Sequence, residues 1–299
     1  MKMDFSYADV SIRAVFDASY DAGGSKRRKF SYFLKDAIEQ NANAIVTAGA
    51  ANSNHAKVAA LACAEQGWEC TIVVHDNEDY SKGNLLLMKM SGARLVFTTL
   101  EQVGPVMDAE MQRFRTEGKH PYYVYGGGHG LPGYLAYYDA AHEFVQANRD
   151  FQPDFIVHAS GTGGTQAGLI VGFNQLLPHS QVLGVSVARQ RARGEQVLRE
   201  SCDSLSQYLG FEVVGDDKIE FADDWIGDGY GSTSPELFAT IKYFARKHGL
   251  ITDPTYTGKA LHGLKQMIDN GRIAPGSKVL FWHTGGLINL FEHTQELIK

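Results

Sequence analysis

The sequence has few of the features that point to a secreted, membrane-bound or nucleic-acid-binding protein. Its three cysteines (Cys63, Cys70 and Cys202) are too few and too scattered for a disulfide framework or a zinc site. We expect Cys63 and Cys70 to be buried, reduced thiols. The 28 Lys and Arg residues are outnumbered by 34 Asp and Glu residues, so no basic surface is available for a nucleic acid partner. No apolar run is long enough to cross a bilayer, and the acidic start does not resemble a signal peptide, so we expect a cytoplasmic protein with no membrane partner.

What is present is the composition of a globular protein. Of 299 residues, 44% are hydrophobic and 21% are charged, which excludes collagen-like, low-complexity and wholly disordered chains. At roughly 100–200 residues per domain, this length predicts two domains or one large α/β domain. Glycine is abundant (32) and proline is sparse (8), as expected for many short loops between regular elements.

Short β-rich runs alternate with helical patterns along the chain. Such alternation predicts parallel sheets with crossover helices, and therefore an α/β fold. The expected strands are residues 44–47, 70–74, 94–97, 122–124, 155–158, 182–185 and 279–282, and the expected helices are residues 53–66, 85–90, 106–115, 165–177, 194–208, 236–248 and 259–269.

The clearest local motif is Ser160-Gly161-Thr162-Gly163-Gly164-Thr165, which follows an expected strand and opens an expected helix. Glycines allow backbone N–H groups to converge, and a helix N-terminus favours an anion, so the motif is suited to a phosphate group. It has neither the lysine of a Walker motif nor the spacing of a dinucleotide-binding turn. A simple tight turn is the alternative interpretation.

A second motif, Gly24-Ser25-Lys26-Arg27-Arg28-Lys29, places four cations in a row. Such runs usually form a solvated face or a helix end. The alternative is chemical, because a lysine crowded by like charges has its neutral amine favoured, as a Schiff-base lysine requires. The apolar residues Phe30, Phe33 and Leu34 place the run at the start of an amphipathic helix.

Polar side chains also follow the first strand of the alternating pattern. In Ser53-Asn54-His55, Ser53 or the preceding Asn52 can be a helix N-cap. The functional alternative is that these groups face a ligand at the carboxyl end of the strand, where open α/β sheets bind ligands. Three later loops have a similar polar or aromatic character, namely residues 228–231, 253–259 and 283–286.

Taken in order, these segments resemble one family, the 1-aminocyclopropane-1-carboxylate deaminase and D-cysteine desulfhydrase group of pyridoxal-phosphate enzymes. The matching pieces are residues 24–29, 53–55, 161–165, 229–231, 253–259 and 283–286. The resemblance implies fold type II, tryptophan-synthase-β-like, with two open, mostly parallel sheets wrapped by helices and the cofactor in the cleft between domains. We expect a large cofactor-binding domain of residues 1–42 plus 149–299, a small domain of residues 43–148, and a homodimer by family analogy.

The resemblance also implies a role for each matching residue. Lys26 would bind pyridoxal 5'-phosphate covalently and move the proton at the substrate's α-carbon, and Asn54 would bond the phenolic oxygen of the cofactor. Ser53 would be a catalytic residue that lies over the substrate, an amino acid, with its hydroxyl near the carboxylate or the reacting carbon. His55 would also contact the substrate. The phosphate would be held by Gly161, Thr162, Gly163, Gly164 and Thr165, while Tyr230 and Tyr256 would line the pocket and assist proton transfer. No metal is implied.

Thr257 would face the pyridine nitrogen, and its identity bears on the reaction. In this family the ring-opening deaminases are expected to carry Glu there, and the desulfhydrase-like members Thr. A threonine can donate to an unprotonated nitrogen, which suits β-elimination. We therefore expect a lyase that releases pyruvate, ammonia and sulfide or a similar group. The alternatives are a 1-aminocyclopropane-1-carboxylate deaminase, a β-replacement synthase of the same fold, and a homologue that has lost turnover.

Overall fold

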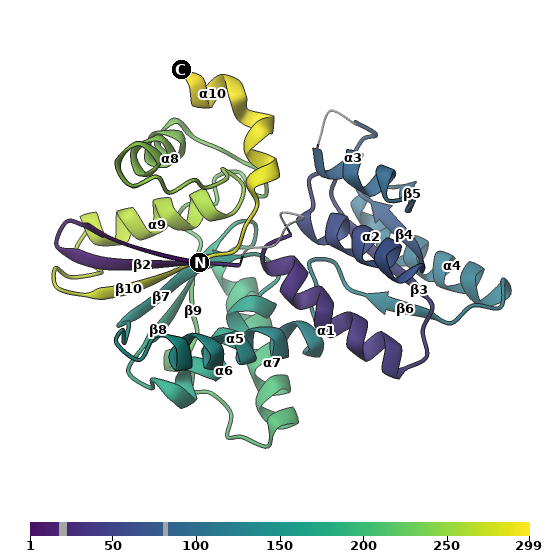
Figure 1. The fold of residues 1–299 in the computed structure, drawn as a ribbon, viewed down its shortest axis with the longest axis horizontal. Helices are drawn as coiled ribbons and strands as arrows, with labels where there is room; N and C mark the ends of the chain where they lie inside the picture. Colours follow the sequence, from purple (N-terminus) through teal and green to yellow (C-terminus); the bar gives the residue numbers. More distant parts are fainter. Residues whose placement is uncertain (18–22, 80–82) are drawn as a thin grey trace. The chain divides into compact units, whose positions relative to one another are not determined.

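The computed structural model describes residues 1–17, 23–79 and 83–299 (Figure 1). The chain forms two compact units, one of Met1–Ala18 with Tyr134–Lys299 and one of Ser19–Gly133. Each unit contains its own sheet, flanked by helices on both faces. None of the helices within the described ranges is both long and apolar enough to span a membrane.

The larger unit contains a six-stranded sheet in the order β1-β2-β10-β7-β8-β9. The β1–β2 pair is antiparallel, and every other neighbouring pair is parallel. Parallel strands buried on both faces are expected to be continuously apolar, and β7 and β10 follow this pattern. The strands are β1 (Lys2–Tyr7), β2 (Val10–Phe16), β7 (Phe155–Ser160), β8 (Gln181–Ser186), β9 (Glu220–Ala222) and β10 (Lys278–His283).

Helices α8 and α9 cover one face of this sheet, and α5, α6 and α7 cover the other (Figure 1). Close packing of α5 on α6 requires glycine, because a Cβ atom on Gly168 would lie 2.3 Å from the carbonyl oxygen of Tyr134. The helices are α5 (Leu131–Ala147), α6 (Gly164–Leu176), α7 (Arg191–Leu209), α8 (Pro235–His248), α9 (Thr257–Asp269) and α10 (Thr294–Ile298), with 3-10 turns η2 (Asp216–Lys218) and η3 (Leu287–His293).

The smaller unit contains a four-stranded parallel sheet in the order β5-β4-β3-β6. Successive side chains of a strand point to opposite faces, so Ile45 joins the core under α1 and α2 while Val46 joins the core under α4. The elements are α1 (Ser25–Glu39), β3 (Ala44–Gly49), α2 (Asn54–Gln66), β4 (Glu69–Val74), α3 (Gly83–Met90), β5 (Arg94–Phe97), η1 (Leu100–Gln102), α4 (Val103–Thr116) and β6 (Pro121–Val124).

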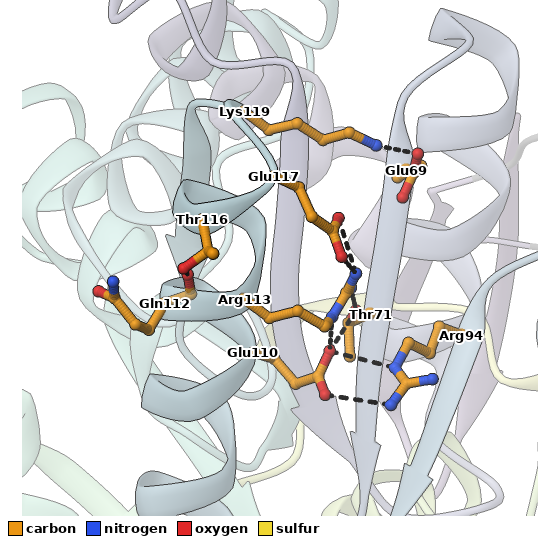
Figure 2. A network of polar contacts seen from close by, with 9 residues as sticks. All are labelled: Glu69, Thr71, Arg94, Glu110, Gln112, Arg113, Thr116, Glu117 and Lys119. Atoms are coloured by element: carbon orange, nitrogen blue, oxygen red, sulfur yellow. Dashed lines mark hydrogen bonds and ion pairs between the residues drawn. The ribbon is translucent and has the colours of Figure 1, made fainter.

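A polar network fastens α4 to the edge of this sheet (Figure 2). The carboxylate of Glu110 accepts hydrogen bonds from Arg113 on the same helix, from Arg94 on β5 and from Thr71 on β4. Burial acts to raise the pKa of Glu110, but the two arginines outweigh it and the net pKa is lowered. Because Glu110 is therefore ionised and paired at neutral pH, the network is a structural support for the smaller unit.

The alternating pattern of the sequence is confirmed, since every expected strand and helix is present with its ends shifted by a few residues. The strand pair β1–β2, the helix α5 and the short strand β9 were not predicted. Cys63, Cys70 and Cys202 are free and buried, as expected for the first two.

The compact units differ from the predicted domain limits in two segments. Phe30 and Phe33 of α1 belong to the core of the four-stranded sheet, so residues 25–39 pack with the smaller unit. Tyr137 and Phe144 of α5 contact Trp282 of β10, so most of α5 packs with the larger unit. The assignment of the cofactor to the larger domain stays a prediction.

Candidate active site

Lys26 is the second residue of α1, which begins directly after Gly24, and the positive φ of 53° at Gly24 turns the chain into the helix. Its side chain is half-buried, and its Nζ donates to the carbonyl oxygen of Gly127 at 3.3 Å. Burial lowers the pKa of Lys26 to about 8. At pH 7 roughly a tenth of the amine is then neutral, far more than for an ordinary lysine. The cause is burial, whereas the sequence interpretation attributed this effect to neighbouring cations.

Ser53 is the N-cap of α2, which confirms the capping interpretation for this residue. Its Oγ accepts a hydrogen bond from the N–H of Ala56 at 3.2 Å. The hydroxyl hydrogen of Ser53 finds no acceptor in the part of the chain that the structure describes. Ser53 therefore caps the helix and still has one hydrogen bond to donate, which fits contact with a carboxylate.

Asn54, the first residue of α2, is oriented by Asn84 of α3. The Nδ2 of Asn84 donates to the side-chain oxygen of Asn54 at 3.1 Å and to the carbonyl oxygen of Asn52 at 2.7 Å. Because the oxygen of Asn54 is engaged in this way, its NH₂ group is directed elsewhere and can donate to a ligand oxygen. Sequence reasoning missed Asn84, since nothing local distinguishes it from a surface asparagine.

His55 is a buried, neutral imidazole. Burial, followed by the charges of Lys26 and Lys29, lowers the pKa of His55 to about 3. Its Nε2 lies 2.8 Å from Oγ1 of Thr47, and Thr47 donates its hydroxyl hydrogen to the carbonyl oxygen of Val124. Nε2 must therefore be the donor to Thr47, which leaves a lone pair on Nδ1.

A glycine-rich turn, residues 126–130, packs against these groups. Gly128 has a φ of +66°, and a Cβ atom there would lie 3.4 Å from Cδ of Lys29 and 3.5 Å from Nδ1 of His55. Gly127 supplies the carbonyl oxygen that accepts from Lys26. The turn needs small residues because it approaches the lysine and histidine side chains closely. Its three consecutive glycines were the available signal in the sequence.

In the larger unit, the motif after β7 forms the expected turn into α6. Gly163 is the N-cap, with a φ of 86° that a side chain would strain. The first N–H groups of α6 have no carbonyl one turn earlier to bond, as at any helix start. The Oγ of Ser160 is buried and lacks a hydrogen-bond partner among the described residues. These groups form a set of donors suited to an anion.

Arg189, which sequence reasoning missed, reaches this turn from the loop after β8. Its Nη1 donates to the carbonyl oxygen of Gly161 at 3.2 Å. Burial, followed by the like charge of Arg193, lowers the pKa of Arg189. No carboxylate pairs with it within the described ranges, so a half-buried cation lies beside the glycine turn without a counter-charge.

Tyr230 and Tyr256 come together through a hydrogen bond between their hydroxyl groups. Burial, followed by the neighbouring Tyr230, raises the pKa of Tyr256 well above its usual value, so the phenol keeps its proton at neutral pH. The loop that carries Tyr230 is held by Lys259 of α9, whose Nζ donates to the carbonyl oxygens of Ile226 at 2.9 Å and Gly229 at 3.1 Å.

Thr257 is the first residue of α9, and its side chain is hydrogen-bonded to Asp253, four residues earlier. Its Oγ1 donates to Oδ1 of Asp253 at 2.7 Å and accepts from the N–H of Asp253 at 3.1 Å. Sequence reasoning recognised Asp253 only as part of a loop motif. The signal it had was the spacing, because an aspartate ahead of a helix start is a usual acceptor for the first N–H groups.

The predicted site residues divide between the two compact units. The unit of Ser19–Gly133 holds Lys26, Ser53, Asn54 and His55, and within it Lys26 and His55 interact. The other unit holds the glycine turn of residues 161–165, the tyrosine pair and Thr257. The described residues include no group of three His, Cys, Asp or Glu side chains placed to bind a metal ion.

The α/β fold carries two sets of groups, an amine of lowered pKa and a glycine turn with donors suited to an anion. This combination is typical of a class of cofactor-dependent enzymes. The chain belongs to the pyridoxal-phosphate dependent enzyme family, whose model matches residues 17–285. The expected resemblance and fold are thereby confirmed.

Named relatives place the chain more finely within that family. It is 32% identical to a D-cysteine desulfhydrase of Klebsiella pneumoniae, over 92% of this chain and 86% of that protein. It is 33% identical to a Pyrococcus furiosus protein, over 98% of this chain and 89% of that protein, whose name gives 1-aminocyclopropane-1-carboxylate deaminase as a provisional assignment. A crystal structure described as an ACC deaminase homologue superposes with a TM-score of 0.88 at 31% identity, covering 96% and 88% of the two chains.

The residues present fit the cofactor of this family. The amine of Lys26 has the lowered pKa that favours reaction with an aldehyde. The hydroxyl of Ser160, for which the described residues supply no hydrogen-bond partner, and the glycine turn that follows it offer donors suited to a phosphate. The chain therefore belongs to the pyridoxal-phosphate dependent enzymes by family, and its donor groups fit that cofactor.

Proposed function

We propose that this enzyme is a lyase that catalyses β-elimination from a small amino acid, as its desulfhydrase relatives are named for doing with D-cysteine. The products are pyruvate, ammonia and sulfide or another leaving group. The observation that carries the proposal is the amine of Lys26, whose pKa is lowered to about 8 by burial at the start of α1. A neutral amine is what covalent attachment of the cofactor and removal of an α-proton both require.

In the unit of Ser19–Gly133, three neighbours support this amine. We assign the NH₂ group of Asn54 to the phenolic oxygen of the cofactor, because Asn84 already engages the side-chain oxygen. Ser53 donates its free hydroxyl hydrogen to the substrate carboxylate. We assign His55 to the substrate side as a neutral group, since its pKa of about 3 keeps it uncharged.

In the larger unit, we assign Gly161, Thr162, Gly163, Gly164 and Thr165 to the cofactor phosphate and Thr257 to the pyridine nitrogen. Tyr230 and Tyr256 share a hydrogen bond, and Tyr256, whose pKa is raised by burial, keeps its proton at neutral pH. Such a pair can donate a proton to a departing group at the β-carbon.

Pyridoxal phosphate, when bound, supplies an electron-withdrawing ring that stabilises negative charge at the α-carbon of an amino acid. The amine of Lys26 accepts the α-proton. As the bond from the β-carbon to sulfur breaks with its electron pair, the tyrosine pair donates a proton to the sulfur. Water then hydrolyses the released enamine to pyruvate and ammonia, which balances the atoms of a β-substituted alanine.

Arg189 is expected to strengthen binding of the cofactor phosphate. Because its guanidinium lies at the glycine turn without a carboxylate partner, Arg189→Met should weaken pyridoxal phosphate about 10- to 100-fold, the usual size of a lost charge-assisted hydrogen bond. Pyridoxal, which lacks the phosphate, should bind both proteins equally, and absorbance titration of the cofactor-free protein measures both affinities. Arg191→Gln, at an exposed arginine paired with Asp224, is the matched control. An equal loss for both compounds would contradict the phosphate role.

A substrate panel tests the reaction itself. D-cysteine, L-cysteine, β-chloro-D-alanine and 1-aminocyclopropane-1-carboxylate are offered in turn, and keto acid, ammonia and leaving group are measured. β-Elimination predicts pyruvate and ammonia in equal amounts from at least one β-substituted amino acid. The proposal is wrong if none of these yields keto acid.

2-Oxobutanoate from the cyclopropane compound would instead establish ring opening, the alternative that the Pyrococcus furiosus relative favours. A new amino acid, formed when a thiol or amine is added, would establish β-replacement.

We also propose that the enzyme is a homodimer and that it acts in the cytoplasm. The support for the dimer is the family resemblance, and the support for the compartment is the amino-acid substrate together with three free, reduced cysteines.

A further inference from the structure

Asp253 is a fully buried carboxylate whose hydrogen-bond partners among the described residues lie at or just before the start of α9. Its Oδ2 accepts from the N–H groups of Thr255 at 3.0 Å and Tyr256 at 2.9 Å. Its Oδ1 accepts from both the N–H and the hydroxyl of Thr257, at 2.9 and 2.7 Å. Gly286 closes the other side, where a Cβ atom would lie 2.6 Å from Oδ1. The carboxylate is therefore fixed in one orientation.

The hydrogen bonds of Thr257 leave it only one free position. A hydroxyl has one hydrogen to donate and two lone pairs to accept with. The hydrogen is directed at Oδ1 of Asp253, and one lone pair accepts from the N–H of Asp253. The other possible acceptor of that hydrogen, the carbonyl oxygen of Gly285, is more distant at 3.4 Å. A further group that meets this oxygen must therefore be a donor.

The charge on Asp253 keeps the hydroxyl in that state at neutral pH. Burial raises the pKa of Asp253 to about 6, and its hydrogen bonds oppose the rise, so the carboxylate is ionised at pH 7 and above. The described ionisable side chains that interact with it are Tyr256, which stays protonated, and Lys259, whose pKa burial lowers to about 8. Neither supplies a proton that would release the hydroxyl of Thr257.

We propose that Asp253 sets the protonation state of the cofactor's pyridine nitrogen by acting through Thr257. The ionised carboxylate retains the hydroxyl hydrogen, so Thr257 meets the ring as an acceptor and the ring nitrogen keeps its proton. Asp253 is thus a positioning residue that touches neither substrate nor cofactor. This inference rests on the proposed placement of Thr257 opposite the ring nitrogen.

The proposal reverses one part of the sequence interpretation. There, Thr257 was expected to donate to an unprotonated nitrogen and so to mark an enzyme with a weak electron sink. With Asp253 behind it, the same threonine meets the ring nitrogen as an acceptor, and the negative charge that a glutamate would carry at this position lies one hydrogen bond further away, on the carboxylate of Asp253. Residue 257 alone then does not separate β-elimination from ring opening, and the substrate panel has to do so.

The test is the nitrogen NMR spectrum of full-length protein loaded with pyridoxal phosphate that carries ¹⁵N in the ring. A ring nitrogen resonates at clearly different positions when it is protonated and when it is not. At pH 8 the wild-type protein should give the protonated signal. Asp253→Asn, which removes the charge, and Thr257→Val, which removes the hydroxyl, should both move the signal to the unprotonated position. Thr257→Ser should restore the wild-type signal.

The matched control is Asp217→Asn, which removes a carboxylate from an exposed position of the same unit and should leave the signal unchanged. If Asp253→Asn does not fold, the signals of the wild-type protein and of the Thr257 variants still test whether the ring nitrogen keeps its proton through Thr257. An unprotonated ring nitrogen in the wild-type protein, or a protonated one in Thr257→Val, overturns this inference and leaves the proposed function standing. Peptide mapping after borohydride reduction separates this from failure of the proposed function, which would leave the cofactor unattached to Lys26.

Discussion

Lys26→Ala is expected to lower turnover of any amino-acid substrate by about 10³-fold or more, with the chain still folded. Under the proposed mechanism, the variant loses both the covalent anchor of the cofactor and the base that accepts the α-proton. His55 cannot replace it, because its pKa is about 3 and its Nε2 is engaged by Thr47. Turnover, the visible absorbance of the loaded protein and the mass of the borohydride-reduced protein measure the effect, and circular dichroism checks the fold.

The matched control for this variant is Lys35→Ala, at an exposed lysine of the same helix, which should retain the wild-type rate. Peptide mapping gives the strictest result. If the reduced cofactor is found on Lys29, one turn further along α1, or if Lys26→Ala still turns over substrate, the assignment of Lys26 is wrong.

Tyr256→Phe is expected to slow elimination of poor leaving groups by about 10²- to 10³-fold, the usual contribution of a general acid. The reason is that Tyr256 keeps its proton at neutral pH and shares a hydrogen bond with Tyr230. Chloride leaves without needing a proton, so β-chloro-D-alanine should be affected only slightly. The measurement is kcat/KM for substrates ordered by the basicity of their leaving groups.

Because the two phenols act through one shared hydrogen bond, the Tyr230→Phe and Tyr256→Phe losses should not add in the double variant. Tyr243→Phe, at a partly exposed tyrosine of α8, is the control and should match the wild type. A loss of the same size for chloride and for poor leaving groups would mean that the pair shapes the pocket and does not donate the proton.

The sequence predicted the strands that form short apolar runs and the helices that show a regular spacing of apolar residues. β7 and β10 are short apolar runs between loops, and parallel pairing in the sheet requires that pattern. The strand pair β1–β2 was missed because β2 pairs with β10, more than 260 residues away in sequence. Helix α5 was missed because its tyrosines and glycine do not form a simple amphipathic stripe.

The candidate site was predictable where residue type alone carries the chemistry. Lysine and a glycine turn are recognisable from sequence, and Lys26 and Gly163 begin helices as expected. Asn84 and Arg189 were not assigned roles, because each depends on a contact with a residue far away in the sequence, Asn54 or Gly161, that only the fold brings within hydrogen-bond distance. Residues of that kind carry no local pattern.

The sequence by itself determined the family and the cofactor, because those follow from motifs in a fixed order. Only the tertiary structure decided the protonation states of these side chains. The pKa of Lys26 is lowered by burial and not by its charged neighbours in the chain. The hydroxyl hydrogen of Thr257 is donated to the buried carboxylate of Asp253. Desolvation and hydrogen bonding depend on what surrounds a group in space, and no local stretch of sequence specifies those surroundings.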